Sequence, residues 1–271
     1  MIYRTLISIT LIIASITASA QKDSSAIQLP VKVNHAEPLC VDLIRDLGAR
    51  RGEREWNIGW GIKDEKETVE QIGFAEYEFS PINRLGLEAE IPFTVSRHSK
   101  YDNSTTTGFT VEGVKLAAQY TFLIYPKYQL SLAAGHIYEF DLNHFLHSNA
   151  ARAQLFSPFF VAAKRWGQYI HSLVYTGPLI EHDLENGHVN KGFQCNVSIH
   201  YVMPQTHNFI GLELNHGNFA NTTQTLLHPQ IKLNLTNKLA IGFTTGIPLS
   251  FSNKNLSFLT RIVYEPQRRK R

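Results

Sequence analysis

The sequence is poor in long apolar runs, in charge and in cysteine. After residue 20 no apolar run approaches the roughly 20 residues that a membrane-spanning helix needs. Any membrane integration there has to use strands. Charged residues make up 18% of the chain, below the roughly 25% typical of soluble domains. The net charge of +3 is close to neutral and gives no reason to expect a nucleic-acid partner.

The only two cysteines are Cys40 and Cys195. In an oxidising compartment they could form a disulfide. Cys195 falls on the apolar face of its expected strand, however, so two free thiols are the simpler interpretation. The sequence leaves both states open.

The amino terminus has the three parts of a secretory signal. Arg4 supplies a positive charge, Leu6–Ala14 is a short apolar stretch, and Ala18–Ala20 is a small-residue cleavage site before Gln21. Gln at the first mature position, where a lipoprotein has Cys, argues against a lipid anchor. We therefore expect 1–20 to be a cleaved signal peptide, with a retained signal anchor as the alternative.

Strict alternation marks residues 55–63, which read Glu-Trp-Asn-Ile-Gly-Trp-Gly-Ile-Lys. Because strand side chains alternate between two faces, the Trp and Ile side chains share one face and the small or polar residues share the other. The pattern recurs to the C-terminus. Strands that are apolar on one face and polar or small on the other are typical of a membrane-spanning β-barrel.

Alternation and turn residues predict about twelve strands. Their expected ranges are 54–64, 71–80, 84–96, 108–124, 128–140, 155–165, 168–180, 191–203, 208–216, 225–235, 238–250 and 255–265. The predicted fold class is all-β, an antiparallel transmembrane barrel over 54–266, followed by a basic tail at 267–271.

The connections between these strands alternate in length. Short turns are expected at 80–83, 125–127, 166–167, 204–207 and 236–238, and mostly longer polar connections at 97–107, 141–154, 181–190 and 217–224. Outer-membrane barrels have short periplasmic turns and longer external loops. Aromatic residues cluster near the expected periplasmic end as a girdle: Trp56, Phe79, Phe122, Tyr128, Trp166, Tyr169, Tyr201, Phe209 and Tyr264. A soluble β-sandwich would not readily supply both features, so we expect an outer-membrane location.

Residues 21–53 precede the barrel and differ from it. Apolar residues in 41–47 recur near helical spacing, and Gly48 follows as a stop signal. We expect a short helix near the periplasmic rim. A plug that enters the lumen and a disordered leader are the alternatives.

Several blocks resemble a family of secreted outer-membrane barrels from Bacteroidota. They are His35–Leu39, Asp42–Arg45, Leu47–Arg50, Glu55–Asn57 and Ser80–Gly86, with Tyr175–Pro178 and Ile262–Pro266 in support. The chain is also loosely similar to transporter barrels linked to aromatic-compound degradation. The resemblance implies fold and location, and no chemistry.

By strand parity, thirteen polar side chains point into the expected lumen. They are Lys63, Glu76, Glu78, Glu88, Glu90, Lys115, Gln119, Glu139, Asp141, His200, Glu213, Lys232 and Arg261. Seven are acids and four are permanent bases, and buried charges need partners or water. A salt-bridge network with Lys115 and Arg261 is one interpretation, and the lining of a cation-favouring conduit is the other.

Histidine is abundant, with twelve in the chain, several of them in or beside expected loops. Zinc needs three or four converging ligands, and no closed ligand motif occurs, so no metal or cofactor is predicted. A barrel acyl hydrolase would need a Ser and His within hydrogen-bond reach. The candidate pairs are His147-Ser148, His171-Ser172 and Ser198 with His200. The first two are adjacent and point to opposite faces, and the third faces the lumen.

We therefore expect a monomeric, non-enzymatic barrel that forms a narrow channel for small solutes. A structural or adhesive barrel without transport is the alternative, and an acyl hydrolase is the less favoured one. The expected partners are outer-membrane lipid, the barrel-assembly machinery and a small solute.

Overall fold

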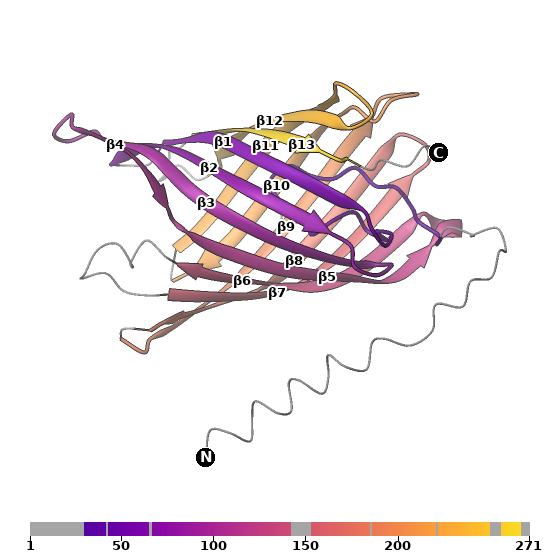
Figure 1. The fold of residues 1–271 in the computed structure, drawn as a ribbon, viewed down its shortest axis with the longest axis horizontal. Helices are drawn as coiled ribbons and strands as arrows, with labels where there is room; N and C mark the ends of the chain where they lie inside the picture. The colour runs from indigo at the N-terminus through magenta and orange to yellow at the C-terminus, as the bar shows by residue number, and fades with distance from the viewer. Residues whose placement is uncertain are drawn as a thin grey trace, which may run out of the picture.

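The strands predicted from alternation form a closed antiparallel barrel in the computed structural model (Figure 1). The structure describes residues 30–41, 43–64, 67–141, 153–184, 186–220, 222–249 and 256–266. The strands are β1 (Arg54–Asp64), β2 (Thr68–Phe79), β3 (Leu85–Ser99), β4 (Thr105–Val111), β5 (Gly113–Tyr125), β6 (Leu130–Asp141), β7 (Ala153–Trp166), β8 (Ile170–Asp183), β9 (Val189–Val202), β10 (Phe209–Phe219), β11 (Thr222–Asn234), β12 (Leu239–Pro248) and β13 (Ser257–Tyr264).

Twelve strands form the wall, because β4 and β5 are two parts of one strand. Both pair with β3, β4 along its outer half and β5 along its first half. Glu112 interrupts them, and its backbone N–H donates to Pro92 O at 2.9 Å. Each remaining strand pairs with its neighbours in sequence, and β1 pairs with both β2 and β13 to close the ring.

The two faces of the wall differ as the alternation predicts. In β1, Trp56, Ile58 and Trp60 are about half exposed, while Glu55 and Asn57, which alternate with them, are buried. The same inside-outside pattern in β3 and β12 is confirmed, with Gly86, Glu88 and Glu90 of β3 buried and Leu85 and Leu87 on the opposite face. An apolar exterior and a polar interior are the reverse of a soluble protein. No helix of the described residues is long and apolar enough to span a membrane.

Three of the expected loops are shorter than predicted. The connections predicted at 97–107, 181–190 and 217–224 are shorter, because β3, β4, β8, β9, β10 and β11 extend into those ranges.

The prediction that Phe209 belongs to the aromatic girdle is wrong. Its side chain is only 2% exposed and packs inside against His200 at 4.6 Å between ring centroids, because β10 begins with Phe209 inward and Ile210 outward. Seven of the others are exposed: Trp56, Phe122, Tyr128, Trp166, Tyr169, Tyr201 and Tyr264.

The helix expected over 41–47 is not formed by the described residues of that stretch. Arg45 has φ +62 and Gly48 has φ +86, outside the range of a right-handed helix. Their backbone N–H groups donate to Glu78 at 2.6 Å and to Thr121 at 2.9 Å. Barrel side chains therefore take the hydrogen bonds that a helix would have made internally. Figure 1 shows this segment, in indigo, as an irregular coil at the end of the barrel where β1 begins.

Candidate functional site

Residues 30–41 and 43–49, called the plug from here on, lie inside the barrel. Side chains or backbone of the plug bond to inward residues of eight strands, β1, β2, β5, β6, β8, β10, β11 and β12. Ala36 N–H donates to His171 of β8 at 2.7 Å, for example, and Leu39 N–H donates to Gln230 of β11 at 2.7 Å. A segment can reach strands all around a closed barrel only from within.

The apolar core of the molecule forms between the plug and one side of the wall. Ile44 and Leu47 are 0% and 3% exposed. They belong to a cluster with Val41, Leu43, Ala117, Ala133, Ile137, Phe159, Val161, Ala163, Leu173 and Tyr175. Full burial of one such aliphatic side chain contributes about 1.5–3 kcal/mol. The plug is therefore packed like the interior of a soluble domain.

Two inward glycines make room for the plug. A Cβ at Gly86 would lie 2.2 Å from the carbonyl oxygen of Ile44, and one at Gly242 would lie 2.6 Å from the Leu39 side chain. At Gly86 the contact is with backbone and excludes a side chain, whereas at Gly242 the Leu39 side chain would have to shift. Glycines on the inner wall could equally have kept an open path wide, but at these two positions the space is occupied by the plug.

The plug places one cation among wall carboxylates. Arg45 Nη1 lies 2.7 Å from Glu55 Oε2 and 3.8 Å from Glu78 Oε2. Asn57 Nδ2 lies 2.9 Å from Glu55, 2.5 Å from Glu76 and 3.0 Å from Glu78, and its two hydrogens are shared among these three carboxylates. Glu55, Asn57, Glu76 and Glu78 are called the acidic pocket from here on. Burial alone would lower the pKa of Arg45, but the carboxylates of Glu55, Asp46 and Glu78 outweigh it and hold that pKa well above its usual range.

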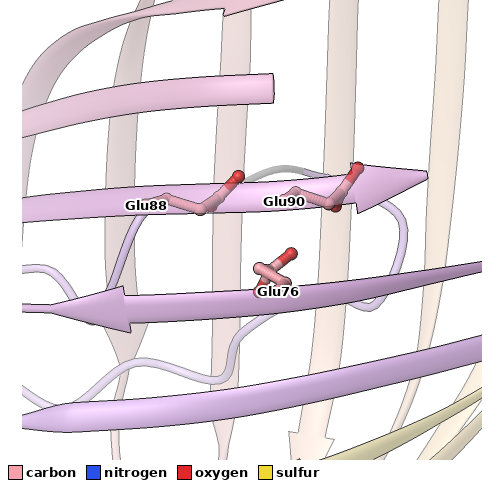
Figure 2. A group of neighbouring side chains, drawn as sticks. All are labelled: Glu76, Glu88 and Glu90. Carbon is pink, nitrogen blue, oxygen red and sulfur yellow. The ribbon is translucent and has the colours of Figure 1, made fainter. Parts of the chain in front are cut away.

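The wall carries its own ion pairs beside this pocket. Arg261 lies 2.6 Å from Glu76, and Lys115 lies 3.0 Å from Glu90 and 3.6 Å from Glu88. These are the partners that the network interpretation of the inward charges expected. In Figure 2 the side chains of Glu76, Glu88 and Glu90 lie side by side on β2 and β3. One carboxylate oxygen of each residue lies within 4.8 Å of those of the other two. That spacing could accommodate a cation, and Lys115 already supplies positive charge there.

The other residues predicted to face inward divide into two groups. Gln119, His200, Glu213 and Lys232 lie at the plug or beside it: Gln119 donates to the Ile44 and Arg45 carbonyls, Glu213 accepts from Cys40 N–H, and Lys232 lies 3.3 Å from Glu37. His200 is 1% exposed and packs on Phe209. Lys63, Glu139 and Asp141 lie instead at the loop ends of β1 and β6, away from the plug, and Lys63 is exposed.

Strand parity missed the plug residues of the site, because they lie outside any strand. Lys32 pairs with Asp46 and lies 3.4 Å from Glu53, and His35 Nε2 lies 2.9 Å from Ser131 Oγ. Burial, followed by the electrostatic influence of His171 and Arg165, lowers the pKa of His35 to about 3. The density of charged residues in 32–46 was the available signal, but spacing alone does not show where such residues lie.

Little space remains between plug and wall at the level of the acidic pocket. A cavity of about 20 Å³ is lined there by Glu37, Leu39, Arg45, Glu55, Glu78, Lys232 and Arg261, among others. Such a volume holds about one water molecule. That cavity is too small for an organic solute.

The remaining chemical candidates are not assembled into a reactive site. Cys40 and Cys195 are not joined in a disulfide. Cys40 lies inside the barrel, 3.3 Å from His228 Nδ1, whereas Cys195 shares the outward parity of Phe193 and Val197, so the wall separates them. Ser198 Oγ has no hydrogen-bond partner among the described residues, and Ser172 Oγ accepts instead from Trp166 Nε1. The pair His147-Ser148 lies outside the described residues.

Solved structures with a similar fold are outer-membrane channels. The COG4313 outer membrane channel from Pseudomonas putida F1 has a TM-score of 0.61 at 15% identity, covering 83% of this chain and 99% of that one. The NanC porin has a TM-score of 0.55 at 9% identity, and the match covers 77% of this chain and 98% of that one. The KdgM porin has a TM-score of 0.53 at 12% identity, with the same coverage of the two chains. Identities this low show the fold alone, that of an outer-membrane channel. No curated protein matches the chain.

A family model extends over nearly all of the chain that follows residue 30. It is described as HAEPLYID-like and matches residues 31–265. The first five letters of that name spell His35–Leu39, the part of the plug that lies against β8 and β11. The bacterial phylum and the link to aromatic-compound degradation stay predictions. The plug and the barrel together fall within the match, and the chain belongs to the HAEPLYID-like family.

Proposed function

We propose that this protein is a narrow outer-membrane channel for small solutes and that the plug closes it. The observation that carries the proposal is the way in which the plug is attached. A channel-like wall surrounds a segment that is bound at one end and otherwise held by side chains. Such a segment can leave the lumen without opening the sheet.

The attachment lies on the turn between β2 and β3. Gly52 N–H donates to Ser80 O at 2.8 Å, Ser80 N–H donates to Glu53 O at 2.9 Å, and Arg84 N–H donates to Ala49 O at 2.6 Å. The bonds that join 30–48 to the wall have a side chain on at least one side. Gly48, with φ +86, directly precedes the attachment, and Gly52, with φ +85, lies within it. Glycine tolerates such backbone angles at no steric cost. These features support a hinge at 48–52.

The proposal includes the membrane location, the orientation and the partners expected from the sequence. The exposed apolar face and aromatic girdle support an outer-membrane location, with the short turns and the plug attachment on the periplasmic side. The barrel-assembly machinery and outer-membrane lipid are the partners that such a setting implies. A monomer is sufficient, because the site is complete within one chain.

A structural or adhesive barrel without transport is the second candidate. The observation that favours it is the filled lumen, since a permanently filled barrel conducts nothing. The two candidates differ in a single respect, namely whether the plug leaves.

A reversible lock tests that difference. Cys40 Sγ lies 3.6 Å from Thr244 Oγ1, so Thr244→Cys should allow a disulfide between plug and wall. In planar bilayers the full chain should show openings that oxidation of Thr244→Cys abolishes and that a reductant restores. Cys40→Ser with Thr244→Cys is the control that cannot be locked. A correctly folded barrel that never conducts, whether reduced or oxidised, would refute transport and leave the structural role.

A further inference from the structure

Arg45 occupies the acidic pocket in an unusual way. It is a non-glycine residue with φ +62, a backbone conformation that ordinary side chains rarely adopt. Its side chain is 2% exposed, and Glu55 and Glu78 beside it are 6% and 2% exposed. The plug therefore accepts an unfavourable backbone angle at the residue whose guanidinium enters the pocket.

All four residues of the pocket belong to the wall. Glu55 is the cross-strand partner of Glu78, and Asn57 is the partner of Glu76, so the four side chains form a square on β1 and β2. Backbone pairing of those two strands fixes this square. The carboxylates are thus arranged in advance of any occupant.

One carboxylate of this square has its close ion pair with the plug and not with the wall. Arg261 lies 2.6 Å from Glu76 and 3.8 Å from Glu78. Among the described residues, Glu55 has its ion pair with Arg45 of the plug. When the plug leaves, Glu55 loses this close ion pair and keeps only the longer-range influence of Lys232 of β11. A buried carboxylate without a close partner is unfavourable.

Two polar atoms in the pocket are also left without hydrogen bonds. Asn57 Oδ1, in a residue that is 0% exposed, and Arg45 Nε have no partner among the described residues. The amide oxygen of Asn57 can accept a hydrogen bond, and Arg45 does not supply one. The tethered guanidinium therefore fits the charge of the pocket but leaves part of its hydrogen-bonding capacity unused.

We infer that the acidic pocket is a binding site for small organic cations of the guanidinium class, with Arg45 as its tethered occupant. This inference rests on the proposed function, since it names the class of solute that would take the place of the plug. A free guanidinium can turn to meet both Glu55 and Glu78 and the Asn57 oxygen, because it lacks the backbone constraint of Arg45. Its planar fork of donors matches paired carboxylates better than a compact ammonium does.

Chemical rescue tests the inference without requiring conduction. Arg45→Ala, purified in detergent, should unfold at a lower temperature than the wild type, because Glu55 loses its ion pair. Millimolar methylguanidinium should restore at least half of that loss, and methylammonium or sodium at equal ionic strength should restore much less. Glu55→Gln added to Arg45→Ala should remove the response. Equal rescue by all three cations, or by none, would overturn the inference.

A second measurement covers the case in which Arg45→Ala does not fold. In wild-type channels methylguanidinium should raise the open fraction at least several-fold over methylammonium, because it competes with Arg45. An open fraction that the two cations change equally would overturn the inference. The two proposals remain separable: rescue in detergent without any conduction refutes only the channel, whereas conduction without guanidinium selectivity refutes only the pocket.

Discussion

The wall and the plug are built from the same chain by opposite rules. Strand β1 is held by backbone ladders on both sides, and its side chains alternate strictly between lipid-facing and inward positions. The plug has no regular secondary structure among its described residues and is held by individual side-chain bonds and an apolar cluster. The wall is therefore held by continuous backbone ladders, while the plug is held by separate side-chain contacts that can each be removed. This difference is what a gate requires.

The largest effect is expected where the plug is most deeply packed. Ile44 is 0% exposed, and Ile44→Ala should weaken the seating of the plug by about 2–5 kcal/mol. Limited proteolysis should then cut the plug. A closed barrel whose backbone groups are all paired resists detergent, so we expect the unheated protein to run faster on a gel than the boiled protein, and Ile44→Ala should keep this shift. Val31→Ala, at a residue that is 54% exposed, is the matched control. Loss of the gel shift in Ile44→Ala would mean that plug and wall fold as one unit.

A pair of neighbouring substitutions in β12 should separate the two regions. Ile241 shares the outward face of its strand and lies two residues from Leu239, the partner of the girdle residue Tyr264. Ile241→Arg should therefore cost up to about 2 kcal/mol, less than the same change at the middle of the bilayer. The yield of folded barrel in a lipid refolding assay should fall accordingly. Gly242 faces Leu39 of the plug, so Gly242→Arg should expel the plug and spare the barrel. The opposite order would indicate that β12 is out of register by one residue.

Acid should loosen the plug through His35. Its pKa of about 3 in the seated plug compares with about 6.5 when free. The released plug therefore binds more protons between these values, and seating weakens as pH falls through that window. Between pH 7.5 and pH 5 the loss is about 2 kcal/mol.

The charged neighbours of His35 require a control for that experiment. His171, Arg165, Asp46 and Lys32 all influence His35, and Glu37 titrates in the opposite sense, because burial and Asp46 raise its pKa. His35→Gln retains a polar side chain opposite Ser131 and removes the titration. The open fraction in bilayers should rise from pH 7.5 to pH 5 in the wild type and rise less in His35→Gln. An equal rise in both would assign the pH response to other groups.

The smallest effect is expected at the far end of the wall. Arg97 lies 2.6 Å from Glu70 but is 54% exposed, and surface pairs of this kind contribute about 0–1 kcal/mol. Arg97→Ala should leave the thermal midpoint and the proteolysis pattern of the plug nearly unchanged. A large change in either would show that the loop end is coupled to the plug.

The same contrast explains what the sequence could predict. Alternation is local, so β1 was predicted at 54–64 and is found at Arg54–Asp64, and the inward parity of Glu76, Glu78, Glu88 and Glu90 follows directly. No alternation of apolar and polar residues runs through the plug to show which of its side chains meet the wall. The position of Arg45 depends on Glu55 and Glu78, and that of Leu39 on Gln230, nearly two hundred residues away. A helical spacing at 41–47 was misleading, because the apolar residues there pack against a surrounding wall and not along one helix face.

The length of strand β3 matters at the end of the barrel opposite the plug attachment. Its 15 residues span roughly 50 Å at about 3.3 Å per residue, and a tilt of about 40° leaves a height near 38 Å against an apolar band of about 25 Å. The hairpin with β4, which carries Thr105–Thr107 and the exposed Tyr101, thus continues as paired sheet beyond the bilayer. On the proposed topology, in which the short turns are periplasmic, this paired ribbon lies on the exterior. An antibody or bacteriophage would meet a preformed epitope there, which it could recognise without the entropic penalty of ordering a loose loop.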